Sequence, residues 1–202
     1  MARVEFFFDL SSPWTYLAFH NIQAIVAETS AEIRWIPFLV GGVFNAVNPG
    51  LYASREDPEN PKLLHMVKSL RDWSAYSGIK MIFPTEHHPV RSVNAMRVCC
   101  ALQDDQPTLF RFATAAFEAY FGDQRNLDDP AVLQAIADRL GLDGAGLIAQ
   151  TQSDVIKDRL RANTQTVIDR GGYGSPTIFI DGNDMYFGND QLPLIARALQ
   201  RN

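Results

Sequence analysis

The sequence contains little cysteine: of 202 residues, only Cys99 and Cys100 carry a thiol. The two are adjacent within a helical pattern, which is poor geometry for a disulfide, and they offer no spacing typical of a metal site. We therefore expect neither a bridge nor a bound metal. Thiols that stay reduced are typical of a cytoplasmic protein.

The chain also lacks long apolar runs and an excess of positive charge. No window approaches the roughly 18 apolar residues of a transmembrane helix, and we expect no secretory signal at the N-terminus. The formal net charge is -5 and the sequence pI about 5.3, so no basic stripe is available for a phosphate backbone or an anionic membrane. We expect neither nucleic acid nor a membrane as a partner.

Apolar residues are abundant: they make up 47% of the chain, which suffices for a sizeable core. Its spacing predicts a buried strand over 4–9, a helix from Pro13 to about 29 and a second strand within 31–38, which together form a βαβ unit. The segment 41–61 is rich in glycine, proline and asparagine. It is predicted to be a long loop, and such loops are often functional.

The rest of the chain is predicted to be a helical block followed by a second mixed segment. A further helix over 153–170 leads to two strands that meet at the turn 181–183, whose sequence Asp-Gly-Asn is typical of a hairpin, and a last helix follows. The helices of the block are predicted over 63–76, 92–102, 109–120 and 130–140.

This order of elements indicates an α/β protein with a thioredoxin-like fold. Its βαβ and αββα halves are separated by an all-helical domain. We expect residues 1–40 and 153–202 to form the thioredoxin-like domain, and residues 41–152 to form the loop and the inserted helical domain.

The first candidate site is the tetrad Ser12-Pro13-Trp14-Thr15, where redox members of this fold carry Cys-Pro-x-Cys. Because it holds no thiol, thiol–disulfide exchange by this protein is excluded. The first N–H groups of the helix and its dipole nevertheless favour an anion there. The Ser12 hydroxyl could stabilise the thiolate of a bound ligand.

Two other interpretations of Ser12 stay open at this point. Serine before proline at a helix start is a common capping arrangement. Ser12 could also be a nucleophile, although no Gly-x-Ser-x-Gly elbow surrounds it.

A second corner precedes a strand at Ser175-Pro176. Such a proline is usually trans, but in a thioredoxin-type fold a cis proline at this place faces the first corner. The N–H and C=O of Ser175 would then point outward and could pair with an extended peptide.

A third candidate is Asn189-Asp190, before the last helix. The pair could be an N-cap, a site for an amino-acid head group, or both. In the second case the helix N-terminus would hold a carboxylate and Asp190 an ammonium.

Together these segments resemble the 2-hydroxychromene-2-carboxylate isomerases and the kappa-class glutathione transferases of the DsbA-like thioredoxin superfamily. The resemblance rests on "FFFDLSSPWTYLA", "LRDWSAYSGI", "GSPTIFIDG" and "YFGNDQL", which occur in the family's order. It runs over nearly the whole chain.

The resemblance implies that glutathione is the cofactor and that Ser12, supported by Ser11, lies beside its sulfur. Ser175, before cis Pro176, would pair with the cysteinyl backbone. The remaining implied contacts are Asn189 and Asp190 at the γ-glutamyl end, and Asn48 and Lys62 at the glycine carboxylate. Taken alone, Lys62 is equally a solvated residue at a helix start.

The implied reaction interconverts 2-hydroxychromene-2-carboxylate and trans-o-hydroxybenzylidenepyruvate in aromatic (naphthalene) degradation. The glutathione thiolate would add to the conjugated carbon, the resulting single bond would rotate, and elimination would return the thiol. Arg91 would pair with the carboxylate of this small aromatic substrate beside Trp14. Taken alone, Arg91 is equally a surface residue and Trp14 a core residue. The resemblance also suggests a homodimer.

Two alternatives to this isomerase remain. A conjugating glutathione transferase would share the first half of the chemistry. A noncatalytic thioredoxin-fold module would bind a peptide and use the corners only as caps.

Overall fold

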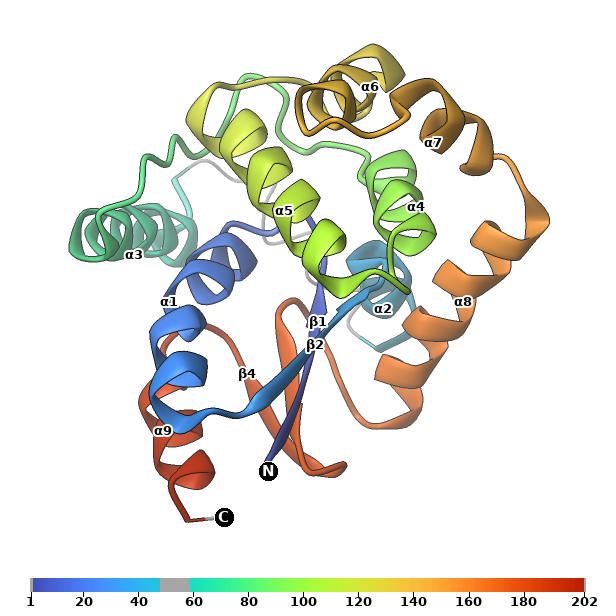
Figure 1. The fold of residues 1–202 in the computed structure, drawn as a ribbon. Helices are drawn as coiled ribbons and strands as arrows, with labels where there is room; N and C mark the ends of the chain where they lie inside the picture. The colour runs from blue at the N-terminus through green and yellow to red at the C-terminus, as the bar shows by residue number, and fades with distance from the viewer. Residues whose placement is uncertain (1, 48–58, 202) are drawn as a thin grey trace.

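A four-stranded sheet lies at the centre of the molecule, with helices against both of its faces (Figure 1). The computed structural model describes residues 2–47 and 59–201. Its elements are, in order, β1 Arg3–Phe8, α1 Pro13–Thr29, β2 Glu32–Pro37, α2 Val40–Val47, α3 Pro61–Ser77, α4 Val93–Ala101, α5 Gln106–Phe117, the π-helix Glu118–Gly122, α6 Pro130–Arg139, α7 Gly144–Gln150, α8 Asp154–Asp169, β3 Thr177–Ile180, β4 Asp184–Phe187 and α9 Leu192–Leu199.

The strand order is β2-β1-β3-β4, so the two halves of the chain meet in one sheet. Strands β1 and β2 run parallel, with Phe7 opposite Ile36. Strand β3 is antiparallel to both β1 and β4. The expected βαβ and αββα halves are therefore present, with helices between them. The domain boundaries at residues 40 and 152 stay a prediction.

Alternating side chains of β1 give the sheet two buried faces. Val4, Phe6 and Phe8 belong to the larger core, which they share with α1, α4, α5 and α9. Phe7 belongs to a smaller core with side chains of α2 and α8. Because β1 is covered on both faces, its sequence is a nearly continuous apolar run.

Aromatic rings join α1 to the inserted helices. The Tyr16 ring stacks on those of Phe117 and Phe121, with centroids 5.2 and 5.6 Å away. Phe19, one turn later, lies 5.2 Å from Phe110 of α5. Such pairs add roughly 0.5–1.5 kcal/mol each beyond burial, so the helix that carries the first corner is fixed against the helical block.

Glutamine side chains bond to both edge strands of the sheet. At β2, Gln106 accepts from the Trp35 N–H (2.7 Å) and donates to the Trp35 carbonyl (3.1 Å). At β4, the Gln191 side chain accepts from the Phe187 N–H at 3.0 Å. Backbone groups at the sheet edges are thereby paired within the chain.

The predicted strands, hairpin turn and four helices between 61 and 139 are confirmed, as is the absence of a bridge between the buried cysteines. The prediction of a loop over 41–61 is wrong in its first part, because Val40–Val47 forms α2. The Val40 N–H donates to Asp9 Oδ2 at 2.8 Å. This bond comes from a residue distant in sequence, so no local pattern reveals it.

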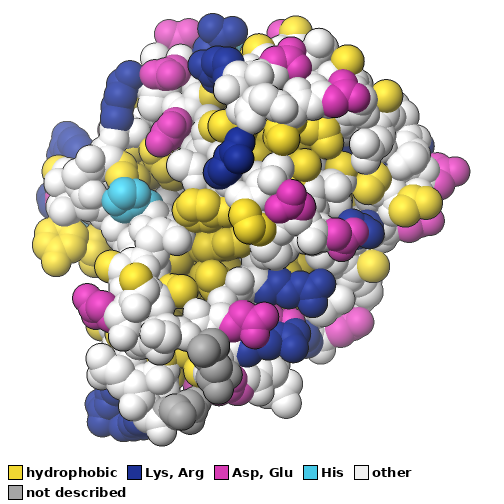
Figure 2. Space-filling model, in the orientation of Figure 1, with side chains coloured by type: hydrophobic (Ala, Val, Ile, Leu, Met, Phe, Trp, Pro, Cys, Tyr) yellow, Lys and Arg dark blue, Asp and Glu magenta, His cyan; other side chains and the backbone are white. Residues whose placement is uncertain are grey.

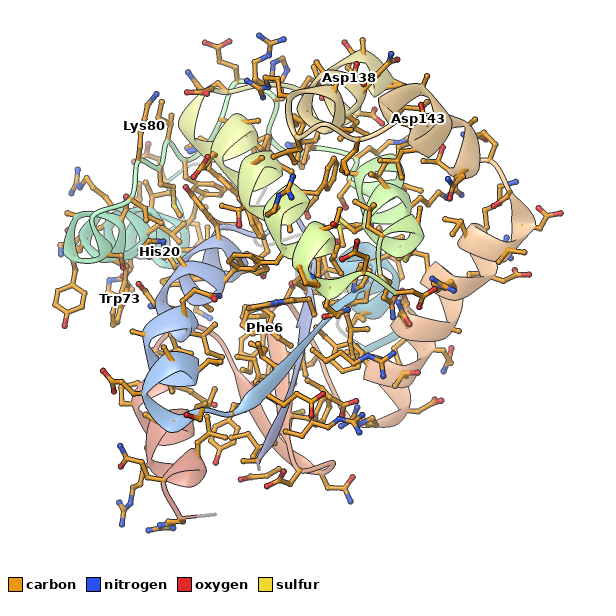
Figure 3. All side chains as sticks on the ribbon, in the orientation of Figure 1. Phe6, His20, Trp73, Lys80, Asp138 and Asp143 are labelled. Carbon is orange, nitrogen blue, oxygen red and sulfur yellow. The ribbon has the colours of Figure 1, made fainter. Side chains whose placement is uncertain are left out.

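The helix α7 was not predicted from the sequence. It begins after Asp143, whose carboxylate accepts from the Gly146 N–H at 2.9 Å, and Asp138 accepts from Gly144 at 3.1 Å (Figure 3). Short polar side chains thus start a helix that contains two glycines. Across residues 2–47 and 59–201, no helix has the length and apolar character needed to cross a membrane.

Replacing Gly172 by alanine should destabilise the protein. An added Cβ would overlap the Val167 side chain and lie 3.0 Å from the Val167 carbonyl oxygen, near the end of α8. We expect Gly172→Ala to lower the free energy of unfolding by about 1–3 kcal/mol in urea titrations. Gly122→Ala is the control, because the nearest atom would be 3.7 Å away. Equal losses in both variants would contradict this explanation.

Candidate active site

Ser12 is the N-cap of α1 and also reaches the second corner. Its hydroxyl oxygen accepts from the Thr15 N–H at 3.2 Å, and its proton is donated to the Ser175 carbonyl at 2.9 Å. The capping interpretation is confirmed. No acidic side chain occupies the first turn of α1, so the positive end of the helix dipole stays available to an anion.

Ser175 lies directly opposite Ser12, and the Ser175–Pro176 peptide bond is cis, as expected for this fold. The Ser175 hydroxyl oxygen accepts from the Asp9 N–H at 3.0 Å and lies 2.7 Å from Thr15 Oγ1. Within the described ranges, the Ser175 N–H has no acceptor. Its carbonyl oxygen keeps one lone pair beside the bond from Ser12. These backbone groups can therefore pair with a peptide.

A buried carboxylate lies beneath the first corner. Asp9 has no exposed surface, and its Oδ1 accepts from both the N–H and the hydroxyl of Ser11 at 2.9 Å. Burial raises the pKa of Asp9 above its ordinary value, and hydrogen bonds from Ser11, Val40 and the Ser92 side chain partly oppose this rise. The corner is thus tied to α2 and to the start of α4.

Asn189 is buried, with 1% of its surface exposed, whereas Asp190 is exposed. The Asn189 side-chain oxygen, Oδ1, accepts from the Asn21 amide of α1 at 2.9 Å, and that amide also donates to Ser77 at the end of α3. In the part of the chain that the structure describes, Asn189 Nδ2 is buried without a partner. The interpretation of this pair as the helix cap is wrong, because Gln191 is the N-cap of α9.

The other predicted site residues lie outside this hydrogen-bond network. Lys62 is exposed at the second position of α3, and Trp14 is half-buried at the second position of α1. Arg91 is exposed, with its Nε 3.8 Å from Asp128 Oδ1. Asn48 lies outside the described residues. The structure therefore brings together Ser12, Ser175 and Pro176, while the roles of the others stay predictions.

Sequence reasoning missed Asp9 and Asn21, and it placed Thr15 in the first corner without its bond to Ser175. Asp9 left a signal, since an acidic residue closes an otherwise apolar strand. Thr15 and Asn21 left none, because their partners are distant in sequence: Thr15 bonds to Ser175 and Asn21 to Asn189. These contacts become visible only when the fold is known.

A separate cavity of about 450 Å³ lies between α1 and α5. Its lining includes Phe19, Phe110, His20 and Lys80, and Figure 3 labels the last two. Figure 2 shows apolar side chains beside a histidine on this face of the molecule. His20 follows Ser12 by eight residues, which is about 12 Å along the helix axis. The cavity contains neither corner, so we place the candidate site at Ser12 and Ser175.

The geometry of two facing corners agrees with the comparison to known families. The family described as DSBA-like thioredoxin domain matches residues 3–200. The chain belongs to this family. The match spans both halves of the sheet and the helices between them.

Curated relatives of this DSBA-like chain include two kinds of enzyme. The 2-hydroxychromene-2-carboxylate isomerase of Pseudomonas sp. (strain C18) is 25% identical over 201 residues, covering 97% of this chain and 89% of the relative. Glutathione S-transferase kappa 1 of Caenorhabditis elegans is 26% identical over 214 residues, covering 100% and 92%. The resemblance inferred from the sequence is therefore confirmed at the level of an isomerase and transferase family.

Solved structures of DSBA-like proteins confirm the fold. A 2-hydroxychromene-2-carboxylate isomerase superposes with a TM-score of 0.82 at 24% identity, covering 98% of this chain and 95% of that one. The cytosolic disulfide reductase DsbM from Pseudomonas aeruginosa with GSH gives a TM-score of 0.64 at 14% identity, covering 99% and 100%. The predicted thioredoxin-like fold with a helical insertion is correct.

The raised pKa of Asp9 predicts a specific pH dependence of stability. Between the unfolded value, near 3.8, and the higher folded value, the folded protein holds a proton that the unfolded chain has released. The free energy of unfolding of wild type, relative to Asp9→Asn, should therefore fall as the pH rises through this range. Urea titrations at several pH values measure this difference.

Asp105 provides a control of opposite sign. Hydrogen bonds from Thr108 lower its pKa, so its contribution to stability is present above the unfolded value and is lost as the pH falls. If the difference in free energy of unfolding between wild type and variant changed with pH in the same direction for Asp9→Asn and Asp105→Asn, at least one of the two assignments would be wrong.

The buried bond between Thr15 and Ser175 should contribute measurably to stability. Thr15→Val removes the hydroxyl but keeps the side-chain shape, and we expect a loss of about 1–2 kcal/mol in the free energy of unfolding. Thr15→Ser keeps the hydroxyl and should cost less. A larger loss for Thr15→Ser would show that the methyl group, not the hydrogen bond, matters here.

Proposed function

We propose that this protein is a glutathione-dependent isomerase that interconverts 2-hydroxychromene-2-carboxylate and trans-o-hydroxybenzylidenepyruvate. The observation that carries the proposal is the Ser12 hydroxyl at the N-terminus of α1, 2.9 Å from the Ser175 carbonyl. A hydrogen-bond donor, a helix dipole and a backbone N–H without an acceptor among the described residues are thus brought to one point. The relatives named as isomerases support the choice of reaction.

The residues at the two corners fit glutathione. Neither Ser12 nor Thr15 supplies a thiol, so a thiolate must come from a bound molecule. Ser175 offers an N–H without an acceptor among the described residues, and Asn189 Nδ2 is buried without a partner there. A cysteinyl backbone and a γ-glutamyl group would satisfy these two donors.

Bound glutathione supplies a nucleophilic thiolate, which allows a conjugated double bond to become single, rotate and re-form. Ser12 would donate a hydrogen bond from its hydroxyl to the sulfur, and for this the hydroxyl would turn away from the Ser175 carbonyl. The α1 N-terminus adds positive potential, so both effects favour thiolate over thiol. Ser175 then holds the cysteinyl backbone.

The remaining proposed contacts secure the ends of the tripeptide. Asn189 and Asp190 bind the γ-glutamyl end, where Asp190 pairs with the ammonium. Lys62 and Asn48 reach the glycine carboxylate.

Arg91 and Trp14 are proposed to bind the aromatic carboxylate substrate. Arg91 is paired with Asp128 only through an exposed contact at 3.8 Å. Exposed pairs contribute little, about 0–1 kcal/mol, so exchanging Asp128 for a substrate carboxylate costs little. The half-buried Trp14 ring lies two residues after Ser12 and offers an apolar surface to an aromatic ring.

A conjugating glutathione transferase is the second candidate, since the kappa transferases are about as similar to this chain as the isomerases are. It would use the same thiolate and omit the elimination step. The third candidate, a noncatalytic peptide-binding module, would use only the Ser175 backbone. The proposal also includes a cytoplasmic homodimer acting in aromatic (naphthalene) degradation.

Conversion of 2-hydroxychromene-2-carboxylate should require glutathione and depend on Ser12. We expect Ser12→Ala to reduce kcat/KM by about 100-fold, because the hydrogen-bond donor to the sulfur is lost. The absorbance change of the substrate, with and without glutathione, measures the rate.

Ser153→Ala is a matched control for this experiment. Ser153 caps α8 by accepting from the Ile156 N–H, as Ser12 caps α1, but it lies in another helix. We expect the Ser153→Ala variant to lose about 1 kcal/mol of stability with its helix cap, and to keep full activity. Glutathione binding without turnover would favour the transferase, and no binding would favour the peptide-binding module.

A further inference from the structure

Asp9 forms hydrogen bonds with residues of both corners. Its carboxylate holds the N–H and hydroxyl of Ser11, its backbone carbonyl accepts from the Ser12 N–H at 3.2 Å, and its own N–H donates to the Ser175 hydroxyl. Both the residue that would donate to sulfur and the residue that would hold the peptide backbone are thus fixed through Asp9.

Burying this carboxylate is costly. A carboxylate removed from water needs a cation or several hydrogen bonds, and across the described ranges no lysine, arginine or histidine forms an ion pair with Asp9. Among the described residues, the hydrogen bonds that compensate this cost come from Ser11, the Val40 N–H of α2 and the Ser92 side chain. An apolar side chain would fill the same space without this cost.

The positions of the three residues that supply these donors explain what the carboxylate achieves. They come from the β1–α1 corner, the start of α2 and the start of α4, so one side chain sets the distance between the sheet and the inserted helices at this point. Because both donors of Ser11 point to Asp9, the chain turns so that the next hydroxyl, Ser12, points outward to Ser175.

We propose that Asp9 is a positioning residue for the thiol site, its carboxylate acting through Ser11 to aim the Ser12 hydroxyl at the sulfur of bound glutathione. This inference rests on the proposed function. Asp9 itself touches neither glutathione nor substrate; it fixes the direction of the hydrogen bond that Ser12 makes.

The test compares the affinities of glutathione and S-methylglutathione, measured by calorimetry. Contacts to the peptide cancel in the ratio of the two, which therefore reports the interaction between Ser12 and the sulfur. We expect wild type to prefer glutathione by about tenfold, the worth of one hydrogen bond to a charged group. Ser12→Ala and Asp9→Asn should both reduce this preference to within about twofold.

A double-mutant comparison separates positioning from a general loss of stability. If Asp9 acts through Ser12, adding Asp9→Asn to Ser12→Ala changes the ratio no further. Leu133→Ala, which leaves a cavity in the core at α6, is the stability control. It should lower the melting temperature without changing the ratio of the two affinities.

Ser11→Ala keeps the test decisive if Asp9→Asn does not fold. It removes one donor to Asp9 and should reduce the glutathione preference severalfold. A preference that is unchanged in every folded variant of Asp9 and Ser11 would overturn this inference alone. Failure of wild type to bind glutathione would instead overturn the proposed function.

Discussion

The hydrogen bond from the Ser12 hydroxyl to the Ser175 carbonyl joins two loops that are 163 positions apart in the sequence. It closes the gap between the first helix and the strand β3, and the same hydroxyl oxygen caps α1. A hydroxyl has one proton, so a ligand that accepts a hydrogen bond from Ser12 replaces the Ser175 carbonyl as the acceptor. Ligand binding and the contact between the two loops are therefore coupled at one atom.

This contact is held in place by packing on both sides of the sheet. Phe6 and Phe8 are covered by α1 and the inserted helices, while Phe7 is covered from the other side. The stack of Tyr16 on Phe117 and Phe121 prevents α1 from tilting away from the helical block. A rigid corner costs little further entropy when a ligand binds, which suits a site that must direct a single hydrogen bond.

Local patterns in the sequence were sufficient for the strands, the hairpin turn and the helix that begins at Pro13, because apolar spacing and Ser-Pro or Asp-Gly signals are local. They failed at α2, whose first N–H is satisfied by Asp9, and at α7, which contains two glycines. The facing of Ser12 and Ser175 followed from the expected fold rather than from the residues alone. The bonds of Thr15 and Asn21 were missed because their partners, Ser175 and Asn189, are brought near only by the tertiary structure. Asp9 was missed although an acidic residue at the end of an apolar strand was visible in the sequence.

The glutamines at the two sheet edges bear on how copies of this chain can associate. Gln106 occupies both backbone groups of Trp35 on β2, and Gln191 occupies the N–H of Phe187 on β4. Neither edge presents an uninterrupted row of free donors and acceptors to a strand from a neighbouring molecule. A sheet that continues from one copy into the next is therefore disfavoured at these positions, which also protects the folded chain from strand-mediated aggregation.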